Sequence, residues 1–264
     1  MTILFLGDVV ARIGRRAVAR GLPKWKKTYK PDLIIANVEN LAHGKGVTEK
    51  TLKEMSDLGI GVFTSGNHIW SNKEVFALYA KKTHAMLLRP ENYPPELPGS
   101  GLWQGVVGKK YVAVVNLIGR GFMPGSYDCP FRAFDRLWQQ VKKDAIVFVD
   151  FHAETTSEKA AFAWYVDGRA TAVVGTHTHV PTADARKLAK GTFFITDVGM
   201  CGYHDGVIGV QKEGIMESMM LQYRQHKIWP EKGNAAVNGI VLTFPERKGS
   251  KPTFTHIHDE VRIE

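Results

Sequence analysis

The chain has 264 residues, 44% of them hydrophobic, which is enough to bury the core of one large α/β domain or two small ones. Its 35 basic and 26 acidic residues give a net charge of +9, which favours anionic partners such as phosphates or nucleic acid. The two cysteines lack metal-site spacing, and neither a signal peptide nor a membrane span is visible. We therefore expect a cytoplasmic protein with no disulfide framework and no membrane contact.

Apolar strands alternate with helical stretches along the chain, which is typical of α/β sheet proteins. The first part predicts strands at 3–6, 33–38 and 61–65, and helices at 15–27 and 48–58. The middle predicts a helix at 73–82, a proline-rich loop at 89–101, strands at 102–107 and 111–117, and a helix at 130–142. The last part predicts strands at 145–151, 170–174, 192–196, 238–244 and 252–262, and a helix at 213–224. No domain boundary is evident, so we expect a single domain over residues 1–264.

Polar side chains suited to metal binding sit at or just beyond the ends of the predicted strands. In open α/β sheets, ligands bind in the crevice beyond the carboxyl ends of the strands. Each such residue also has an ordinary explanation as a helix cap, a surface acid, a turn residue or a buried core histidine. Six of them at equivalent strand ends nevertheless indicate one common site, formed by Asp8, Glu39, Asn67, His152, His177 and His179.

The strongest local signal is Gly175-Thr176-His177-Thr178-His179, which follows a short apolar run. In extended backbone, the imidazoles of histidines at this spacing can point the same way or lie on either side of one small ligand. The β-branched Thr178 between them favours extended backbone. Neutral imidazole is the commonest metal ligand in proteins, although two histidines in a surface turn is the alternative.

Three imidazoles, two carboxylates and an amide oxygen supply enough ligands for two divalent cations. Mixed nitrogen and oxygen donors suit Mn²⁺, Fe²⁺ or Zn²⁺, and the absence of a thiolate argues against copper(I) and iron–sulfur clusters. Two such ions carry more positive charge than Asp8 and Glu39 neutralise, which favours a bound hydroxide and an anionic phosphate ester. Two-metal sites activate water as a nucleophile and stabilise both ends of an in-line displacement.

These residues resemble the metallophosphoesterase superfamily, which carries a series of short motifs at successive strand ends. The matching segments here are Gly7-Asp8, Glu39-Asn40, Gly66-Asn67-His68, His152 and His177-Thr178-His179. Further segments at 42–46, 150–154, 167–169 and 196–200 make the chain most similar to the YmdB-like subfamily of bacterial phosphodiesterases. The resemblance implies a four-layer α/β/β/α sandwich of the calcineurin-like type with a dimetal site at the sheet edge. It also implies metal-dependent hydrolysis of 2′,3′-cyclic nucleotides.

The superfamily pattern is broken at two positions, and the subfamily shares both changes. Val10 stands where a ligand histidine is usual, and Glu39 stands where the bridging residue is usually Asp. The neighbouring side-chain oxygen of Asn40 can take the vacated coordination position. The resemblance then implies one metal held by Asp8, Glu39, Asn40 and His179, and a second held by Glu39, Asn67, His152 and His177. Glu39 would bridge the two ions, roughly 3.5–4 Å apart as in other two-metal sites.

By the same resemblance, His68 follows a ligand but lies outside the coordination shell, where it can protonate the leaving ribose oxygen as a general acid. A structural turn histidine is the alternative. His43 lies in a Gly-rich loop that could face the substrate. Asp150, Glu154 and Asp197 could orient ligand imidazoles or could equally be ordinary caps.

Two other classes of function stay open. One is a regulatory or RNA-binding protein that keeps the metals as a structural or sensing element, although no RNA-binding motif with paired aromatics is evident. The other is a phosphomonoesterase or protein phosphatase built on the same site. The sequence also leaves open the metal identity, the physiological nucleotide or RNA-derived substrate, direct RNA contact and assembly into a homo-oligomer.

Overall fold

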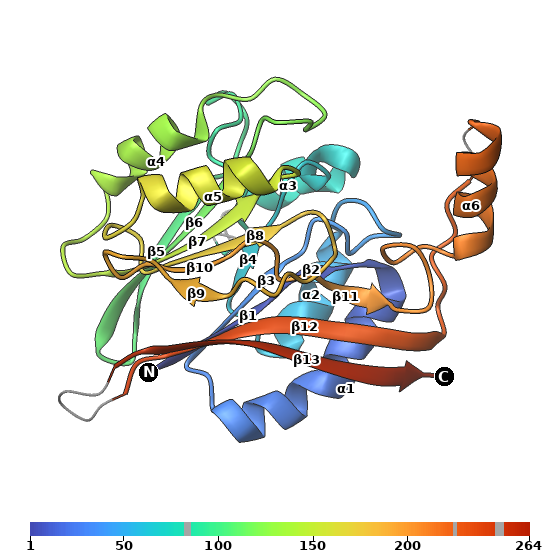
Figure 1. Cartoon of the computed structure of the whole chain (residues 1–264), viewed down its shortest axis with the longest axis horizontal. Helices are drawn as coiled ribbons and strands as arrows, with labels where there is room; N and C mark the ends of the chain where they lie inside the picture. The colour runs from blue at the N-terminus through green and yellow to red at the C-terminus, as the bar shows by residue number, and fades with distance from the viewer. Residues whose placement is uncertain (82–85, 224–225, 246–250) are drawn as a thin grey trace.

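The computed structural model describes residues 1–81, 86–223, 226–245 and 251–264, and in these ranges two β-sheets lie face to face (Figure 1). The first sheet contains β1 (Thr2–Leu6), β2 (Asp8–Val9), β3 (Leu33–Asn37), β4 (Val62–Thr64), β11 (Met200–Tyr203), β12 (Gly233–Thr243) and β13 (Thr253–Ile263). The second contains β5 (Leu102–Val107), β6 (Lys110–Ile118), β7 (Ile146–His152), β8 (Ala172–Thr176), β9 (Arg186–Lys187) and β10 (Phe193–Ile195). The strand orders are β2-β11-β12-β1-β3-β4, with β13 pairing β12, and β5-β6-β7-β8-β10-β9.

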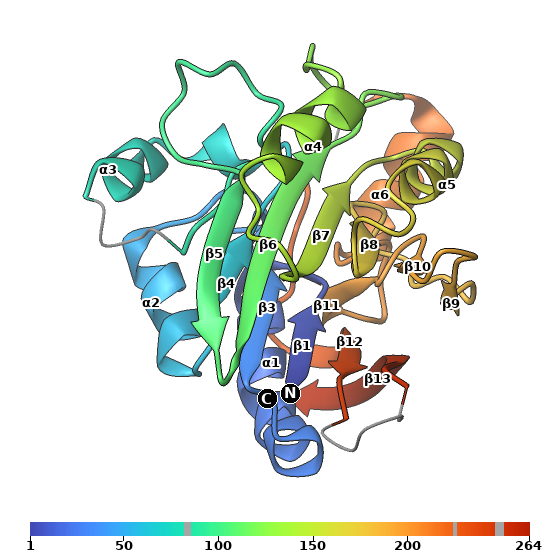
Figure 2. The ribbon, with the colours of Figure 1, turned by 90° about the vertical axis from the view of Figure 1, so that its left-hand side faces the viewer.

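Helices cover the outer face of each sheet (Figure 2). The first sheet packs against α1 (Ala11–Tyr29), α2 (Glu49–Asp57) and α3 (Glu74–Ala80), and the second against α4 (Pro130–Trp138) and α5 (Thr156–Tyr165). Alternate residues of β1 show how the sequence builds these layers, because successive strand side chains point to opposite faces. Ile3 and Phe5 pack between the sheets, whereas Leu4 and Leu6 face the helices. The expected four-layer α/β/β/α sandwich is confirmed.

The strand directions bring several loops to one edge of the sandwich. β1, β3 and β4 are mutually parallel, as are β6, β7, β8 and β10. The carboxyl ends of parallel strands share one edge of a sheet, so the segments after these strands emerge together. The closing strands predicted at 238–244 and 252–262 are β12 and β13, which pair antiparallel, and β12 begins five residues earlier than predicted.

Several predicted boundaries differ from the structure. Helix α1 begins four residues earlier than predicted, and α4 ends at Trp138 rather than at residue 142. After Trp138 the chain tightens into turns, with hydrogen bonds from Gln140 N to Leu137 O (2.8 Å) and from Val141 N to Trp138 O (3.3 Å). Helix α5 and strands β9 and β11 were not predicted at all. The predicted helix ends at residues 82 and 224 lie outside the described residues.

A final helix, α6 (Lys212–Leu221), projects from the body of the molecule (Figure 1). It contains no buried residue, and Met219, Met220 and Leu221 are largely exposed. No helix within the described ranges is both long enough and apolar enough to cross a membrane.

Two glycines of α1 allow a matched test of helix packing. A Cβ on Gly14 would lie 2.3 Å from the carbonyl oxygen of Cys201, whereas one on Gly21 would lie 3.6 Å from Val237, an ordinary contact. Gly14→Ala should therefore destabilise the protein by about 1–3 kcal/mol through overpacking. Gly21→Ala should stabilise it by about 0.5–1 kcal/mol because alanine is the better helix former. Urea unfolding monitored by circular dichroism measures both; equal effects of the same sign would contradict the packing of α1 on β11.

Candidate metal centre

The seven predicted ligands lie together at the shared sheet edge. Asp8 is the first residue of the short strand β2, separated by one residue from the end of β1; Glu39 and Asn40 follow β3, and Asn67 follows β4. His152 is the last residue of β7 rather than the first residue beyond it. His177 and His179 follow β8. Most of these side chains are buried, and both sheets contribute to the group.

One half of the centre is built around Nε2 of His152. This atom lies 3.0 Å from Oδ1 of Asn67, 3.0 Å from Nδ1 of His177 and 3.4 Å from Oε2 of Glu39. Glu39, His152 and His177 each offer one ligand atom within 4.8 Å of the others, so this group could hold a metal ion. Gly66 makes the close approach possible, because a Cβ there would lie 2.2 Å from Nε2 of His152.

The other half is built around Asn40. Its Nδ2 lies 3.1 Å from Oε1 of Glu39 and 3.3 Å from Nε2 of His179. The two carboxylate oxygens of Glu39 therefore face different halves of the centre. Asp8 accepts a hydrogen bond from the backbone of His177 at Oδ2, while its buried Oδ1 has no hydrogen-bond partner among the residues that the structure describes.

Val10, at the position of the missing superfamily histidine, is buried in a small apolar cluster with Ala11 and Met200. It contributes no polar atom to the centre.

Hydrogen bonds fix which nitrogen of each imidazole is available. Nδ1 of His179 donates to the carbonyl of Ile208 (3.0 Å), which leaves Nε2 facing Asn40. Nδ1 of His152 lies 2.9 Å from Oγ1 of Thr176, which in turn donates to Oδ1 of Asp150 (2.7 Å). Such outer partners orient a metal-binding imidazole and fix its tautomer.

Nε2 of His177 lies 3.0 Å from a carboxylate oxygen of Glu154, which leaves Nδ1 of that ring facing His152. Two of the three suspected orienting acids therefore have that role, Asp150 through a hydroxyl relay and Glu154 directly.

Burial keeps the imidazoles neutral. It lowers the pKa of His152 well below its usual value and also lowers the pKa values of His177 and His179. Burial alone would raise the pKa of Glu39, but hydrogen bonds from the side chain and backbone of His68 help to lower it overall. The centre therefore presents neutral nitrogen ligands beside an ionised carboxylate, which are the forms that bind cations.

Negative charge is in excess around Asp8. Burial raises the pKa of Asp8 well above its usual value, and the nearby carboxylates of Glu39, Asp197 and Asp150 raise it further. A cation at the unpartnered Oδ1 would relieve both effects, because opposite charge favours the ionised form. The nitrogen and oxygen donors and the orphaned carboxylate oxygen therefore fit divalent metal ions.

The backbone of the two-histidine loop is not extended, so that part of the prediction is wrong. His177 has φ = 101° and His179 has φ = 67°, both in the left-handed region. Asp197 holds this turn by accepting hydrogen bonds from the backbone of Thr178 (3.1 Å) and Gly199 (2.8 Å). These tertiary hydrogen bonds outweigh the local preference of Thr178 for extended backbone.

Asp197 is itself held by a buried ion pair with Lys159 of α5, at 2.7 Å, and both side chains have no solvent exposure. Asp197 therefore positions the loop backbone instead of orienting an imidazole.

His68 lies at the rim of the centre with 29% of its side chain exposed. Its Nδ1 lies 2.8 Å from Oδ1 of Asn40 and 3.2 Å from Oε1 of Glu39. Among the described residues, no hydrogen bond or ion pair engages Nε2. The ring is thus anchored through one nitrogen to two of the predicted ligands and can present the other nitrogen to a bound molecule.

Three contributors to the centre were not found from the sequence. Thr176 lies within the motif at 175–179, but the hydrogen bonds by which its hydroxyl links His152 to Asp150 depend on the register of β7 and β8. The carbonyl of Ile208 is a backbone group that any residue could supply, so the type of side chain at this position does not indicate its contact with His179. Lys159 lies in the helix that was not predicted.

Comparison with known proteins identifies the family. A family model described as YmdB-like protein matches residues 4–257. The 2′,3′-cyclic-nucleotide 2′-phosphodiesterase of Bacillus subtilis strain 168 is 43% identical over 94% of this chain and 92% of its own length. The crystal structure of a hypothetical protein from Thermus thermophilus superposes with a TM-score of 0.90 at 42% identity, covering 98% of this chain and 99% of that one. A novel phosphatase from Mycoplasma pneumoniae superposes with a TM-score of 0.89 at 33% identity, covering 100% of this chain and 94% of that one. The chain therefore belongs to the YmdB-like protein family.

Proposed function

We propose that the protein is a dimetal-dependent phosphodiesterase that hydrolyses 2′,3′-cyclic nucleotides. The observation that carries the proposal is the convergence of Glu39, Asn67, His152 and His177 around one point, in a chain 43% identical to a phosphodiesterase of that specificity. The ligands come from both sheets, so we also propose that residues 1–264 act as one catalytic domain.

The proposed ligand set divides between the two halves of the centre. Asp8, Asn40 and His179 would hold one ion with Oε1 of Glu39. Asn67, His152 and His177 would hold the second with Oε2 of Glu39. The opposed directions of the two Glu39 oxygens support its role as the bridge.

Asn40 needs one adjustment to act as a ligand. The atom that faces Glu39 and His179 is the amide nitrogen Nδ2, and amide nitrogen does not bind cations. Turning the amide about its Cβ–Cγ bond exchanges Oδ1 and Nδ2 at similar volume, which places the oxygen toward the ion. This turn removes one acceptor of the Nδ1 hydrogen of protonated His68, which keeps Oε1 of Glu39 at 3.2 Å as its acceptor, and Nε2 of that ring stays free for a substrate.

When bound, the two divalent ions, Mn²⁺, Fe²⁺ or Zn²⁺, would supply a water nucleophile and neutralise charge on the phosphate. The protein's part is to hold neutral imidazoles and ionised Glu39 in place. His68 holds a proton at Nε2 and gives it to the ribose O2′ as the P–O2′ bond breaks, which leaves a 3′-phosphate.

A phosphomonoesterase is the second candidate, favoured by the similarity to the Mycoplasma pneumoniae phosphatase. Metal-loaded protein assayed on 2′,3′-cyclic AMP, a nucleoside monophosphate and a phosphopeptide separates these activities. We expect the cyclic nucleotide to have the highest kcat/KM. Preference for a monoester would support the second candidate, and absence of any turnover would favour a binding or regulatory role.

Metal content tests the ligand set directly. Wild-type protein dialysed against Mn²⁺ should retain two ions per chain by inductively coupled plasma mass spectrometry. His177→Ala should retain fewer, because it removes Nδ1 from the group around His152. The control His204→Ala removes an exposed histidine that contacts Glu260 instead, and it should retain both ions. Retention of two ions by His177→Ala would contradict the assignment of His177 as a metal ligand.

The role of His68 can be separated from metal binding. His68→Ala should keep both ions and lower turnover of 2′,3′-cyclic AMP by roughly 10²–10⁴-fold, the usual worth of acid–base catalysis. The loss should be smaller on an activated aryl phosphodiester, whose leaving group departs without a proton. Equal losses on both esters would show that His68 positions the phosphate and does not protonate the leaving group.

A further inference from the structure

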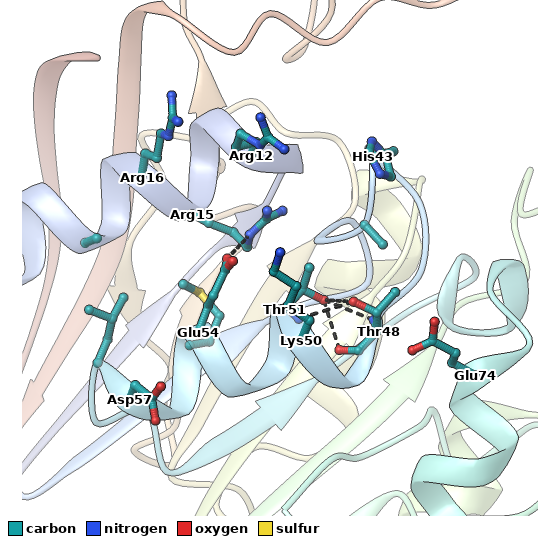
Figure 3. Close-up of a pocket in the computed structure, with 14 residues that line it drawn as sticks. Arg12, Arg15, Arg16, His43, Thr48, Lys50, Thr51, Glu54, Asp57 and Glu74 are labelled. Carbon is teal, nitrogen blue, oxygen red and sulfur yellow. Dashed lines mark hydrogen bonds and ion pairs between the residues drawn. The ribbon is translucent and has the colours of Figure 1, made fainter. Parts of the chain in front are cut away.

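A groove of about 840 Å³ runs between α1 and α2 on the outer face of the first sheet (Figure 3). Arg12 and Arg16 lie on its α1 side, Lys50 lies on its α2 side, and His43 stands at one end. None of the seven proposed metal ligands lines it.

The acidic residues of the groove are already engaged. Glu54 pairs with Arg15 at 2.5 Å, and Asp57 pairs with Lys53 at 2.8 Å. Glu74 accepts a hydrogen bond from the backbone of Glu49 (3.2 Å).

The basic residues of the groove are less fully engaged in ion pairs than its acidic residues. Within the described ranges, neither Arg16 nor Lys50 forms an ion pair, and both are exposed. Arg12 pairs with Glu231 at 2.6 Å, but both side chains are about half exposed, and such pairs contribute little stability. The groove therefore offers positive charge that an anionic ligand can use.

The loop that carries His43 has a fixed shape. Hydrogen bonds from Ala42 N to Gly46 O (2.9 Å) and from Lys45 N to Ala42 O (3.0 Å) close it. Gly44 has φ = 82° and lies so close to Trp229 that a Cβ there would come within 2.2 Å of the indole. His43 itself adopts φ = 52°, a conformation that non-glycine residues rarely take outside functional sites and turns. The loop thus presents an exposed imidazole at the end of the groove.

This end of the groove is close to the metal centre. His43 follows Asn40 by three residues, which cannot span more than about 11 Å even when fully extended. Helix α1 begins three residues after Asp8, and the backbone N of Ala11 donates to the carbonyl of Asn40 (2.9 Å). The Cα atoms of His43 and Asn40 are therefore at most about 11 Å apart, a gap that a few nucleotides of a bound strand would span.

We propose that this groove binds the sugar–phosphate backbone of single-stranded RNA whose 3′-terminal 2′,3′-cyclic phosphate is hydrolysed at the metal centre. The inference rests on the proposed function and makes it more specific. The substrate class becomes oligoribonucleotides with a cyclic phosphate end, such as RNA cleaved by transesterification, rather than cyclic mononucleotides alone. The product of this step is the same RNA with a 3′-phosphate.

The test compares two double variants that each remove two positive charges. Arg16→Ala/Lys50→Ala alters the groove. The control, Lys109→Ala/Lys143→Ala, removes exposed lysines that precede β6 and β7, at the edge of the second sheet opposite the metal centre. Binding is measured by fluorescence anisotropy with a labelled hexaribonucleotide carrying a 3′-phosphate, over a range of salt concentrations. Hydrolysis is measured on 2′,3′-cyclic AMP and on a hexaribonucleotide ending in a 2′,3′-cyclic phosphate.

The groove variant should bind the RNA about 25-fold more weakly at 0.1 M salt. The slope of the logarithm of its binding constant against the logarithm of salt concentration should fall in magnitude by about 1.4, because each of two lost phosphate contacts contributes about 0.7 on a single strand. Its kcat/KM on cyclic AMP should equal that of wild type, and its KM for the hexaribonucleotide should rise. Equal RNA binding by the groove variant and the control variant would overturn the groove proposal. Failure of wild type to hydrolyse cyclic AMP would overturn the proposed function instead, and the binding measurement would still decide the groove.

Discussion

Buried negative charge is the constraint on which this structure depends. The carboxylates of Asp8, Glu39, Asp150 and Asp197 are all buried beside one sheet edge. Removing a carboxylate from water costs several kcal/mol unless opposite charge or hydrogen bonds compensate. Lys159 compensates Asp197, and three side-chain donors compensate Asp150, but within the described part of the chain one oxygen of Asp8 accepts no hydrogen bond. This excess of negative charge favours a cation at the centre and, through the cation, an anionic ester.

The packing of the two sheets fixes the positions of these buried carboxylates and of the histidines around them. Each sheet delivers part of the ligand set, so the apolar layer between the sheets, where Phe5 packs on Phe148 at 5.4 Å, also fixes distances within the centre. Gly66 and Gly175 let backbone and side chains meet more closely than any other residue would allow. The same strand register thus sets both the packing of the core and the distances between the side chains of the centre. A change of register would disturb both.

The sequence predicted the parts of the fold that follow simple periodicity. Strands such as β7 are continuous apolar runs because both of their faces are buried, and polar residues at their ends stand out clearly. Helix α5 escaped prediction because Lys159 occupies one of its buried positions and interrupts the apolar pattern. The relay from His152 through Thr176 to Asp150 also escaped, since it depends on which residues lie opposite one another on β7 and β8. Six ligand candidates could be named in advance because polar side chains recur at the ends of predicted strands that should meet at one sheet edge, and Asn40 was added through the family resemblance.

The left-handed backbone at His177 and His179 has a consequence for the evolution and redesign of the centre. Beyond glycine, Asn and Asp are the other residues that tolerate such φ values well, whereas β-branched residues do not. Both tolerated residues are oxygen donors, so the accessible changes at these two positions replace imidazole nitrogens with harder donor atoms. Drift along this path would shift the metal preference of the centre toward harder ions such as Mn²⁺ or Mg²⁺ without any change of fold.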